Sequence, residues 1–230
     1  MQQFDVEADA QRVFYTLAAG GIAVIHLDVA YAVLAHSEAA VRRIYAAKRR
    51  SFAKPTGIVG SLDAHDALQI LGERERRMVR SIVLDHDLPL AVIAPYRADH
   101  PFLARLAPFV LGNATKDGTL NMLLNVGALR TRIAEISWRE RLPLVGTSAN
   151  ASLTGSKYRV EDIDAEVLEI ADIVIDYGLS RYHNPAGHSS TMIDFAALKV
   201  VRAGVCYEQI AAVLRAEFGV DLDATRGQRG

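Results

Sequence analysis

The sequence lacks several features that mark common classes of protein. Its single cysteine, Cys206, excludes an intrachain disulfide and a metal site built from several cysteines. No apolar run approaches the roughly 20 residues that a membrane-spanning helix needs. The N-terminus has neither the basic start nor the apolar run of a signal peptide. These absences predict a soluble protein of a reducing compartment, the cytoplasm.

Familiar catalytic motifs are missing as well. The chain has no Walker-type glycine-rich loop, no Gly-x-Gly-x-x-Gly and no Gly-x-Ser-x-Gly. Its seven histidines show no metal-ligand spacing, so we predict no resident metal site. His86, between Asp85 and Asp87, either coordinates an ion or lies in a solvated loop.

What the chain does have is apolar residues: 50% of its 230 residues are hydrophobic and 23% are charged. A chain of this size can bury a large core, and one domain is favoured over two. The 26 lysines and arginines nearly balance the 27 acidic residues. Any contact with phosphate or RNA must therefore come from a local cluster of cations rather than from the net charge.

Hydrophobic periodicity predicts helices and strands interspersed along the chain. Helices are expected over 4–19, 38–48, 63–70, 73–79, 101–110, 128–140, 160–171 and 207–218. Strands are expected over 22–25, 56–60, 89–94, 120–124, 142–145, 173–175, 192–194 and 200–202. The strand at 22–25 is rich in β-branched residues and should be buried on both faces. The interspersed elements predict an α/β or mixed α+β fold, and residues 221–230 are predicted to form a mobile tail.

A basic cluster closes the second predicted helix. Lys48, Arg49, Arg50 and Lys54 place four cations within seven residues. Lysine supplies point charges and arginine a fork for phosphate oxygens, so the cluster is a candidate anion site. The alternative is a solvated helix end.

Two further clusters contain small polar residues. Ser148 and Asn150 follow the apolar strand at 142–145, and such strand-end loops commonly hold ligands in α/β proteins. Ser190 and Thr191 enter the strand at 192–194, and Arg202 lies a few residues further on. These residues could bind phosphate, or they could form ordinary turns and a solvated strand edge.

In this order, the three clusters resemble those of the YrdC-like domain family, whose best-known members are L-threonylcarbamoyladenylate synthases. Family members carry Lys-x-Arg before Lys-Pro, then Pro-Leu-x-x-x-Ser-Ala-Asn. They end with Ser-Thr-hydrophobic-hydrophobic-Asp and a hydrophobic-Arg-x-Gly. The corresponding stretches here are 48–55, 143–150, 190–194 and 201–204. The resemblance spans roughly residues 13–204.

The resemblance implies a twisted mixed sheet with flanking helices and a concave, positively lined face. It places the YrdC-like domain at residues 1–206 and a C-terminal helix and tail at 207–230. It also implies an ATP-dependent nucleotidyltransferase that converts threonine, bicarbonate and ATP into threonylcarbamoyl-AMP and pyrophosphate, for modification of transfer RNA. ATP is the expected substrate, together with Mg²⁺, and tRNA is expected to bind indirectly or weakly. Any ATP would lie on the concave face of the sheet.

Residue by residue, the resemblance assigns catalytic roles to Lys48 and Arg50. It assigns a substrate pocket to Asp28 and Tyr31. Nucleotide or phosphate binding falls to a set of cationic, hydroxyl and amide side chains: Lys48, Arg50, Lys54, Ser148, Asn150, Ser190, Thr191 and Arg202.

The sequence departs from the family pattern at the substrate side. In the family segment Pro-Thr-Asp/Glu-Thr-x-Tyr-Gly-Leu, both threonines are replaced here, by Leu27 and Val29. The family's strand arginine has no counterpart within 120–125. Arg130 and Arg132 follow, but on a predicted helix where they are expected to face elsewhere.

Two functions remain open at this point. One is an active adenylate-forming enzyme, with threonine or with an altered acyl substrate. The other is a non-catalytic relative that binds a nucleotide or RNA. A second arginine-rich stretch, at 74–80, either contacts a nucleic-acid backbone or forms a solvated helix face.

Overall fold

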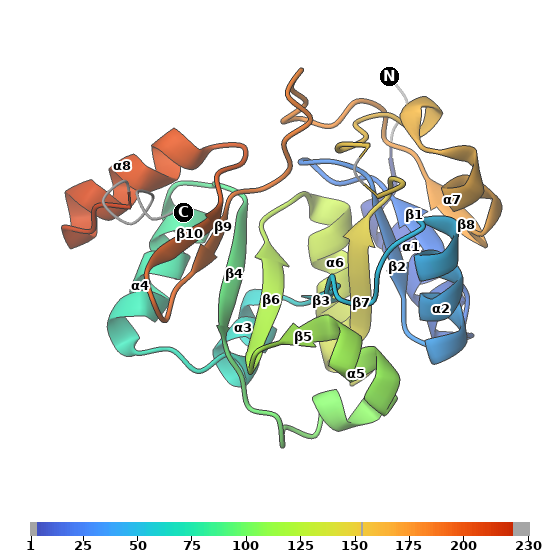
Figure 1. Cartoon of the computed structure of the whole chain (residues 1–230), viewed down its shortest axis with the longest axis horizontal. Coiled ribbons are helices and arrows are strands. Elements are labelled where there is room, and N and C mark those ends of the chain that lie inside the picture. The colour runs from blue at the N-terminus through green and yellow to red at the C-terminus, as the bar shows by residue number, and fades with distance from the viewer. Residues whose placement is uncertain (1–3, 153, 223–230) are drawn as a thin grey trace.

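The computed structural model describes residues 4–152 and 154–222, and these residues form a mixed α/β fold around one large sheet (Figure 1). The strand order is β10-β9-β4-β6-β3-β7-β2-β1-β8, and β5 pairs with β6 outside this path. The sheet is mixed: β1 and β2 pair antiparallel, as do β4 and β6, whereas β1 and β8 pair parallel, as do β3 and β6. The predicted mixed sheet with flanking helices is confirmed.

The strands are short, and most lie near the predicted ranges. They are β1 (Ala23–Ile25), β2 (Ala32–Ala35), β3 (Gly57–Val59), β4 (Leu90–Pro95), β5 (Thr115–Lys116), β6 (Thr119–Leu124), β7 (Leu144–Ser148), β8 (Ile173–Ile175), β9 (Met192–Asp194) and β10 (Lys199–Arg202). All three residues of β1 are buried, as predicted. The prediction missed β2, whose four residues are all buried and which therefore shows no alternation of polar and apolar side chains.

The helices divide between the two faces of the sheet. The α-helices are α1 (Val6–Ala18), α2 (Glu38–Ala47), α3 (Leu62–Leu68), α4 (Glu73–Arg80), α5 (Pro108–Ala114), α6 (Ala128–Arg139), α7 (Ala165–Glu169) and α8 (Tyr207–Phe218). Short 3-10 turns lie at Leu103–Arg105 and Val160–Asp162, and a π-helical turn at Ser81–Asp85 continues α4. Helices α1 and α6 contribute to one apolar core, and α2, α3, α4, α5, α7 and α8 to the core on the opposite face.

Two predicted helices are divided in the structure. The prediction of one helix over 101–110 was wrong, because Ala107 is extended and α5 begins at Pro108. Proline is favoured at the first helical position and disfavours helical backbone in the residue before it. The predicted helix over 160–171 is likewise interrupted by extended backbone at Ile163 and Asp164, so that α7 is short. Of the predicted tail over 221–230, only residues 221 and 222 lie within the described part of the chain.

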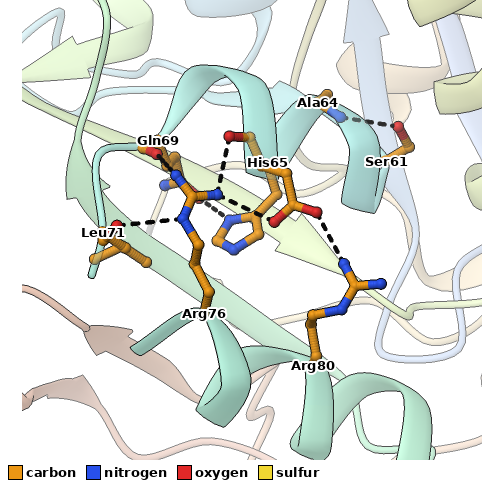
Figure 2. Close-up of polar contacts among 8 residues, drawn as sticks. Ser61, Ala64, His65, Gln69, Leu71, Arg76 and Arg80 are labelled. Carbon is orange, nitrogen blue, oxygen red and sulfur yellow. Dashed lines mark hydrogen bonds and ion pairs between the residues drawn. The ribbon is translucent and has the colours of Figure 1, made fainter. Parts of the chain in front are cut away.

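The arginine-rich stretch at 74–80 binds the protein's own groups. Arg76 donates to the carbonyl oxygens of Leu71 and Gln69, at 3.2 and 3.0 Å, and to Asp66. Arg80 donates to the other carboxylate oxygen of Asp66 at 2.8 Å. Figure 2 shows both guanidinium groups reaching from α4 toward α3. These contacts fasten α4 to α3 through Arg76 and Arg80. Arg74, Arg77 and Arg80 are exposed, and contact of this stretch with a nucleic-acid backbone stays a prediction.

Beneath that contact, His65 and Gln69 form a buried polar pair (Figure 2). The amide nitrogen of Gln69 donates to the carbonyl oxygens of Val92 and Leu120, at 3.1 and 2.9 Å. Its amide oxygen is thus the acceptor at 2.6 Å from Nδ1 of His65, which must carry the proton. Burial lowers the pKa of His65, so the ring is neutral. The pair ties α3 to β4 and β6.

Candidate functional site

A pocket of about 220 Å³ lies on the sheet face that also carries α6. Its wall includes residues of strands β2, β3, β4, β6, β7 and β9, which are far apart in the sequence. The sheet places Leu34, Val59 and Gly146 on the α6 side, opposite the core built by the other helices. The volume is below the roughly 300–1,000 Å³ of typical drug-sized ligand sites, so the enclosed part suits a small molecule.

The pocket brings together five of the predicted site residues: Tyr31, Arg50, Ser148, Ser190 and Arg202. The other predicted residues, Lys48, Lys54, Asn150, Thr191 and Asp28, are not in its lining. The functional roles assigned to all of them stay predictions. The structure does show what each side chain contacts.

Lys48 lies behind the pocket wall. It is 1% exposed, and its Nζ donates to the backbone carbonyl oxygens of Ser148 and Asn150. Burial, and then the neighbouring charge of Arg50, lower the pKa of Lys48 to about 7. Its own carbonyl oxygen accepts from the amide of Ser152 at 3.0 Å. Lys48 therefore shapes the strand-end loop that follows β7.

Hydrogen bonds of its own side chains also hold this loop in place. The hydroxyl of Ser148 donates to the side-chain oxygen of Asn150, whose amide nitrogen donates to the carbonyl of Ala151 at 2.6 Å. The Asp164 carboxylate accepts from the backbone amide of Ala151 at 2.7 Å. The Ser-Ala-Asn motif thus builds a turn, and of its two polar side chains only Ser148 lines the pocket.

The third cluster consists of Ser190 and Thr191, which precede β9, and Arg202, at the end of β10. The two segments meet at Gly204. Arg202 donates from Nε and Nη2 to the Ser190 carbonyl oxygen, at 3.1 and 2.8 Å. Thr191 is fully buried; its hydroxyl donates to the Val205 carbonyl and accepts from the amide of Gly204. A Cβ on Gly204 would lie only 2.1 Å from the carbonyl oxygen of Ser189. The Arg-x-Gly pattern therefore reflects a close backbone approach, for which only glycine leaves room.

Arg50 lines the pocket from the other side. Its Nε and Nη2 donate to the carbonyl oxygens of Lys54 and Pro55, at 3.3 and 2.8 Å. These two bonds use two of the five N–H groups of a guanidinium. Lys54 itself is exposed and contributes its carbonyl rather than its ammonium group to this arrangement.

The two residues assigned to the substrate pocket differ in position. Tyr31 is fully buried, and its hydroxyl donates to the Asp176 carboxylate and lies 2.8 Å from the Gly178 carbonyl. Burial and Asp176 raise the pKa of Tyr31, so the phenol stays protonated. Asp28 lies against Gly127 at the start of α6, outside the lining.

Arg130 is the residue that the sequence analysis missed. We expected the side chains of Arg130 and Arg132 to face away from the ligand site. For Arg130 this was wrong, because its side chain lines the pocket and is 4% exposed. Arg132 does face outward, where it pairs with Glu7 and Glu135. On a helix, positions two apart point in different directions. A sequence signal was available, since Arg130 shares its helix face with the apolar Ile133 and Ala134.

The charged side chains that line the pocket are all cationic. The lining contains Arg50, Arg130 and Arg202 and, among the described residues, no aspartate or glutamate. Guanidinium groups without acidic neighbours favour an anionic ligand. No helix in the described part of the chain is long and apolar enough to cross a membrane.

Solved structures share this fold. A hypothetical protein of Streptococcus mutans UA159 superposes with a TM-score of 0.75 and 21% identity, covering 91% of this chain and 92% of that one. P. abyssi Sua5, solved in complex with L-threonine, gives a TM-score of 0.70 at 20% identity and covers 93% of this chain and 59% of its own. E. coli YciO gives 0.62 at 18% identity, covering 89% of this chain and 92% of that one.

Sequence comparison agrees with the fold. A protein of Methanocaldococcus jannaschii named "Putative threonylcarbamoyl-AMP synthase" is 28% identical over 191 residues, which is 81% of each chain. The family model Sua5_yciO_yrdC, described as telomere recombination, matches residues 15–204, most of the sequence. The chain therefore belongs to the Sua5/YciO/YrdC family, as the residue motifs predicted.

Proposed function

We propose that this chain is an ATP-dependent, adenylate-forming nucleotidyltransferase of the threonylcarbamoyl-AMP synthase type. It joins a small amino acid, bicarbonate and ATP into a carbamoyl adenylate and pyrophosphate, for the modification of transfer RNA. The observation that carries the proposal is a pocket lined by three arginines and, in the described chain, no carboxylate. The name of the M. jannaschii relative and the threonine bound to P. abyssi Sua5 support it.

The reaction needs charge stabilisation more than covalent chemistry. A carbamate oxygen attacks the α-phosphorus of ATP while the bond from that phosphorus to its bridging oxygen breaks, and pyrophosphate leaves. Negative charge is spread over the phosphoryl oxygens as this happens. Arg50 and Arg202 bind these oxygens, and the hydroxyl of Ser190, which accepts from Arg202, supplies a further donor.

Lys48 serves this site as a positioning residue. Its Nζ is occupied by the carbonyls of Ser148 and Asn150, so it holds the loop that carries the Ser148 hydroxyl. A pocket wall that is preorganised in this way needs no rearrangement as charge develops in the transition state.

The described residues contain no group of three or more His, Cys, Asp or Glu side chains that could hold a metal ion. Magnesium usually binds through one or two carboxylates together with the phosphates of its substrate. Because the described pocket lining contains no aspartate or glutamate, its residues do not fit a protein-held magnesium, and any Mg²⁺ would arrive on the phosphates of ATP.

A second candidate function is non-catalytic binding of a nucleotide or RNA. Leu27 and Val29 line the pocket, and the Tyr31 hydroxyl is engaged with Asp176 rather than free for a ligand. These features reduce the number of donors available to an amino-acid substrate.

Pyrophosphate release distinguishes the two functions. The purified chain is given ATP, bicarbonate and each of the twenty amino acids in turn, and AMP binding is measured by calorimetry. We expect release with at least one amino acid. AMP binding without any release would favour the non-catalytic function, and the absence of both would contradict both candidates.

Arg50→Gln provides the matched test of the site. We expect it to weaken AMP binding by about tenfold or more, because a charged hydrogen bond to phosphate is worth roughly 1.5–3 kcal/mol. Arg49→Gln is the control, since Arg49 is exposed and pairs with Glu166 outside the pocket. Equal binding by the two variants would refute the role of Arg50.

A further inference from the structure

Arg130 is a buried cation without a counter-charge. Its Nη1 donates to the Gly60 carbonyl at 2.8 Å, and its Nη2 lies 3.5 Å from the Ile58 carbonyl. The ion pairs within the described residues do not include it. Burial lowers the pKa of Arg130 to about 10, with no carboxylate acting in the other direction. The group nevertheless stays charged at neutral pH.

Such an arrangement is costly unless an anion completes it. Removing a charge from water without pairing it costs several kcal/mol in real proteins. Two carbonyl oxygens satisfy only part of a guanidinium that carries five N–H donors. The same side chain lines the pocket, so an anion that enters the pocket can reach it.

The wall of the pocket on the α6 side of the sheet contains four apolar side chains, next to the amide of Asn121. Leu27, Val29, Val59 and Leu123 belong to or pack on the core on the α6 side of the sheet, and all four line the pocket. The hydroxyls of the lining come from Tyr31, from Thr56 directly before β3, and from loops and strand ends at 147–148, 156 and 189–190. An apolar wall favours an apolar ligand body and pairs poorly with a hydroxyl.

We propose that Arg130 binds the carboxylate of a small organic acid, and that the body of this acid is apolar. An arginine fork suits the two oxygens of a carboxylate, and the leucine and valine side chains that line the same pocket suit an aliphatic chain. The inference rests on the proposed function for the reaction in which the acid is used. Binding of the acid is a separate property and can be measured without nucleotide.

The test compares three probes of nearly equal size: L-valine, L-threonine and 3-methylbutanoate. Calorimetry without nucleotide measures their affinities for the parent chain, for Arg130→Met and for Arg132→Gln. Arg132 is the matched control, because it lies two positions away on α6 and pairs with Glu7 and Glu135 on the surface. AMP binding is measured for each variant as a separate readout of the phosphate side.

We expect valine or 3-methylbutanoate to bind about tenfold tighter than threonine, a difference within the range that an apolar pocket achieves against an added hydroxyl. Arg130→Met should lose this binding and keep AMP binding, while Arg132→Gln keeps both. Val29→Thr, a nearly isosteric change, should reduce the preference over threonine even if Arg130→Met fails to fold.

Several results would overturn the inference: no binding of any probe, undiminished binding in folded Arg130→Met, or threonine bound at least as tightly as both apolar probes. The proposed function fails differently. If 3-methylbutanoate binds through Arg130 but no amino acid supports pyrophosphate release, the acid site stands and the synthase reaction does not.

Discussion

Gly204→Ala tests whether the close backbone approach at the Arg-x-Gly motif organises the site. The added Cβ would lie 2.1 Å from the Ser189 carbonyl oxygen and 2.5 Å from the Ser190 carbonyl carbon, against more than 3.4 Å for an ordinary contact. Both neighbours are backbone atoms, so no flexible side chain can move aside. The segments at 189–191 and 204–205 must separate by more than an ångström.

That separation would break two hydrogen bonds, from the Gly204 amide to the Thr191 hydroxyl and from the Val205 amide to the Ser189 carbonyl. Each such bond contributes about 1 kcal/mol, and overpacking adds roughly 1–3 kcal/mol. We therefore expect a loss of about 3–5 kcal/mol in the free energy of unfolding. For a chain of this size that corresponds to a fall in Tm of roughly 6–20 °C. AMP binding should weaken as well, because Ser190 and Arg202 are attached to the displaced segment.

Thermal unfolding by circular dichroism measures the effect. Gly112→Ala is the control: a Cβ there meets nothing within 4 Å, and the residue lies within α5. Alanine favours a helix over glycine by about 0.5–1 kcal/mol, so this variant should equal or exceed the parent in Tm. If Gly204→Ala unfolds at the temperature of the parent and binds AMP as well, the reasoning is refuted.

Two further predictions concern buried polar side chains. The folded-state pKa of Lys48 is about 7, below the 10.5 of an exposed lysine, so the unfolded chain binds more protons between these values and the free energy of unfolding rises with pH there. Urea unfolding at pH 7 and pH 9 should show this rise in the parent and a smaller one in Lys48→Met; an equal rise in both would contradict the assignment. Gln69→Leu removes the bonds to the Val92 and Leu120 carbonyls and should lower the free energy of unfolding by about 2–4 kcal/mol. Gln11→Leu, on the exposed face of α1, should not, and similar urea midpoints for the two variants would argue against the buried pair as a stabilising contact.

Local pattern predicted much of the fold because most elements carry a local signal. The strand at 22–25 is a β-branched run after two glycines, and β1 lies there with both faces buried. The helix predicted over 38–48 begins after Ser37, whose side chain caps the first turn. Strand β2 is equally buried but carried a weaker signal, because Val33 is its only β-branched residue and its two ends are alanines.

The candidate site was predicted only in part. The motif residues indicated the family, which requires only the order of residues along the chain. They did not indicate which side chains meet in the pocket. Lys48 and Asn150, both in the motifs, use their side chains inside the 148–150 loop and outside the lining.

The sequence by itself determined the mixed α/β class, most of the elements and membership in the family, because periodicity and motif order are properties of the chain. Only the tertiary structure decided that Arg130 enters the pocket while Arg132 faces outward. It also decided that Gly204 lies against the Ser189–Ser190 backbone. Both depend on how distant segments pack against one another, and packing is set by the whole sheet rather than by neighbours in sequence.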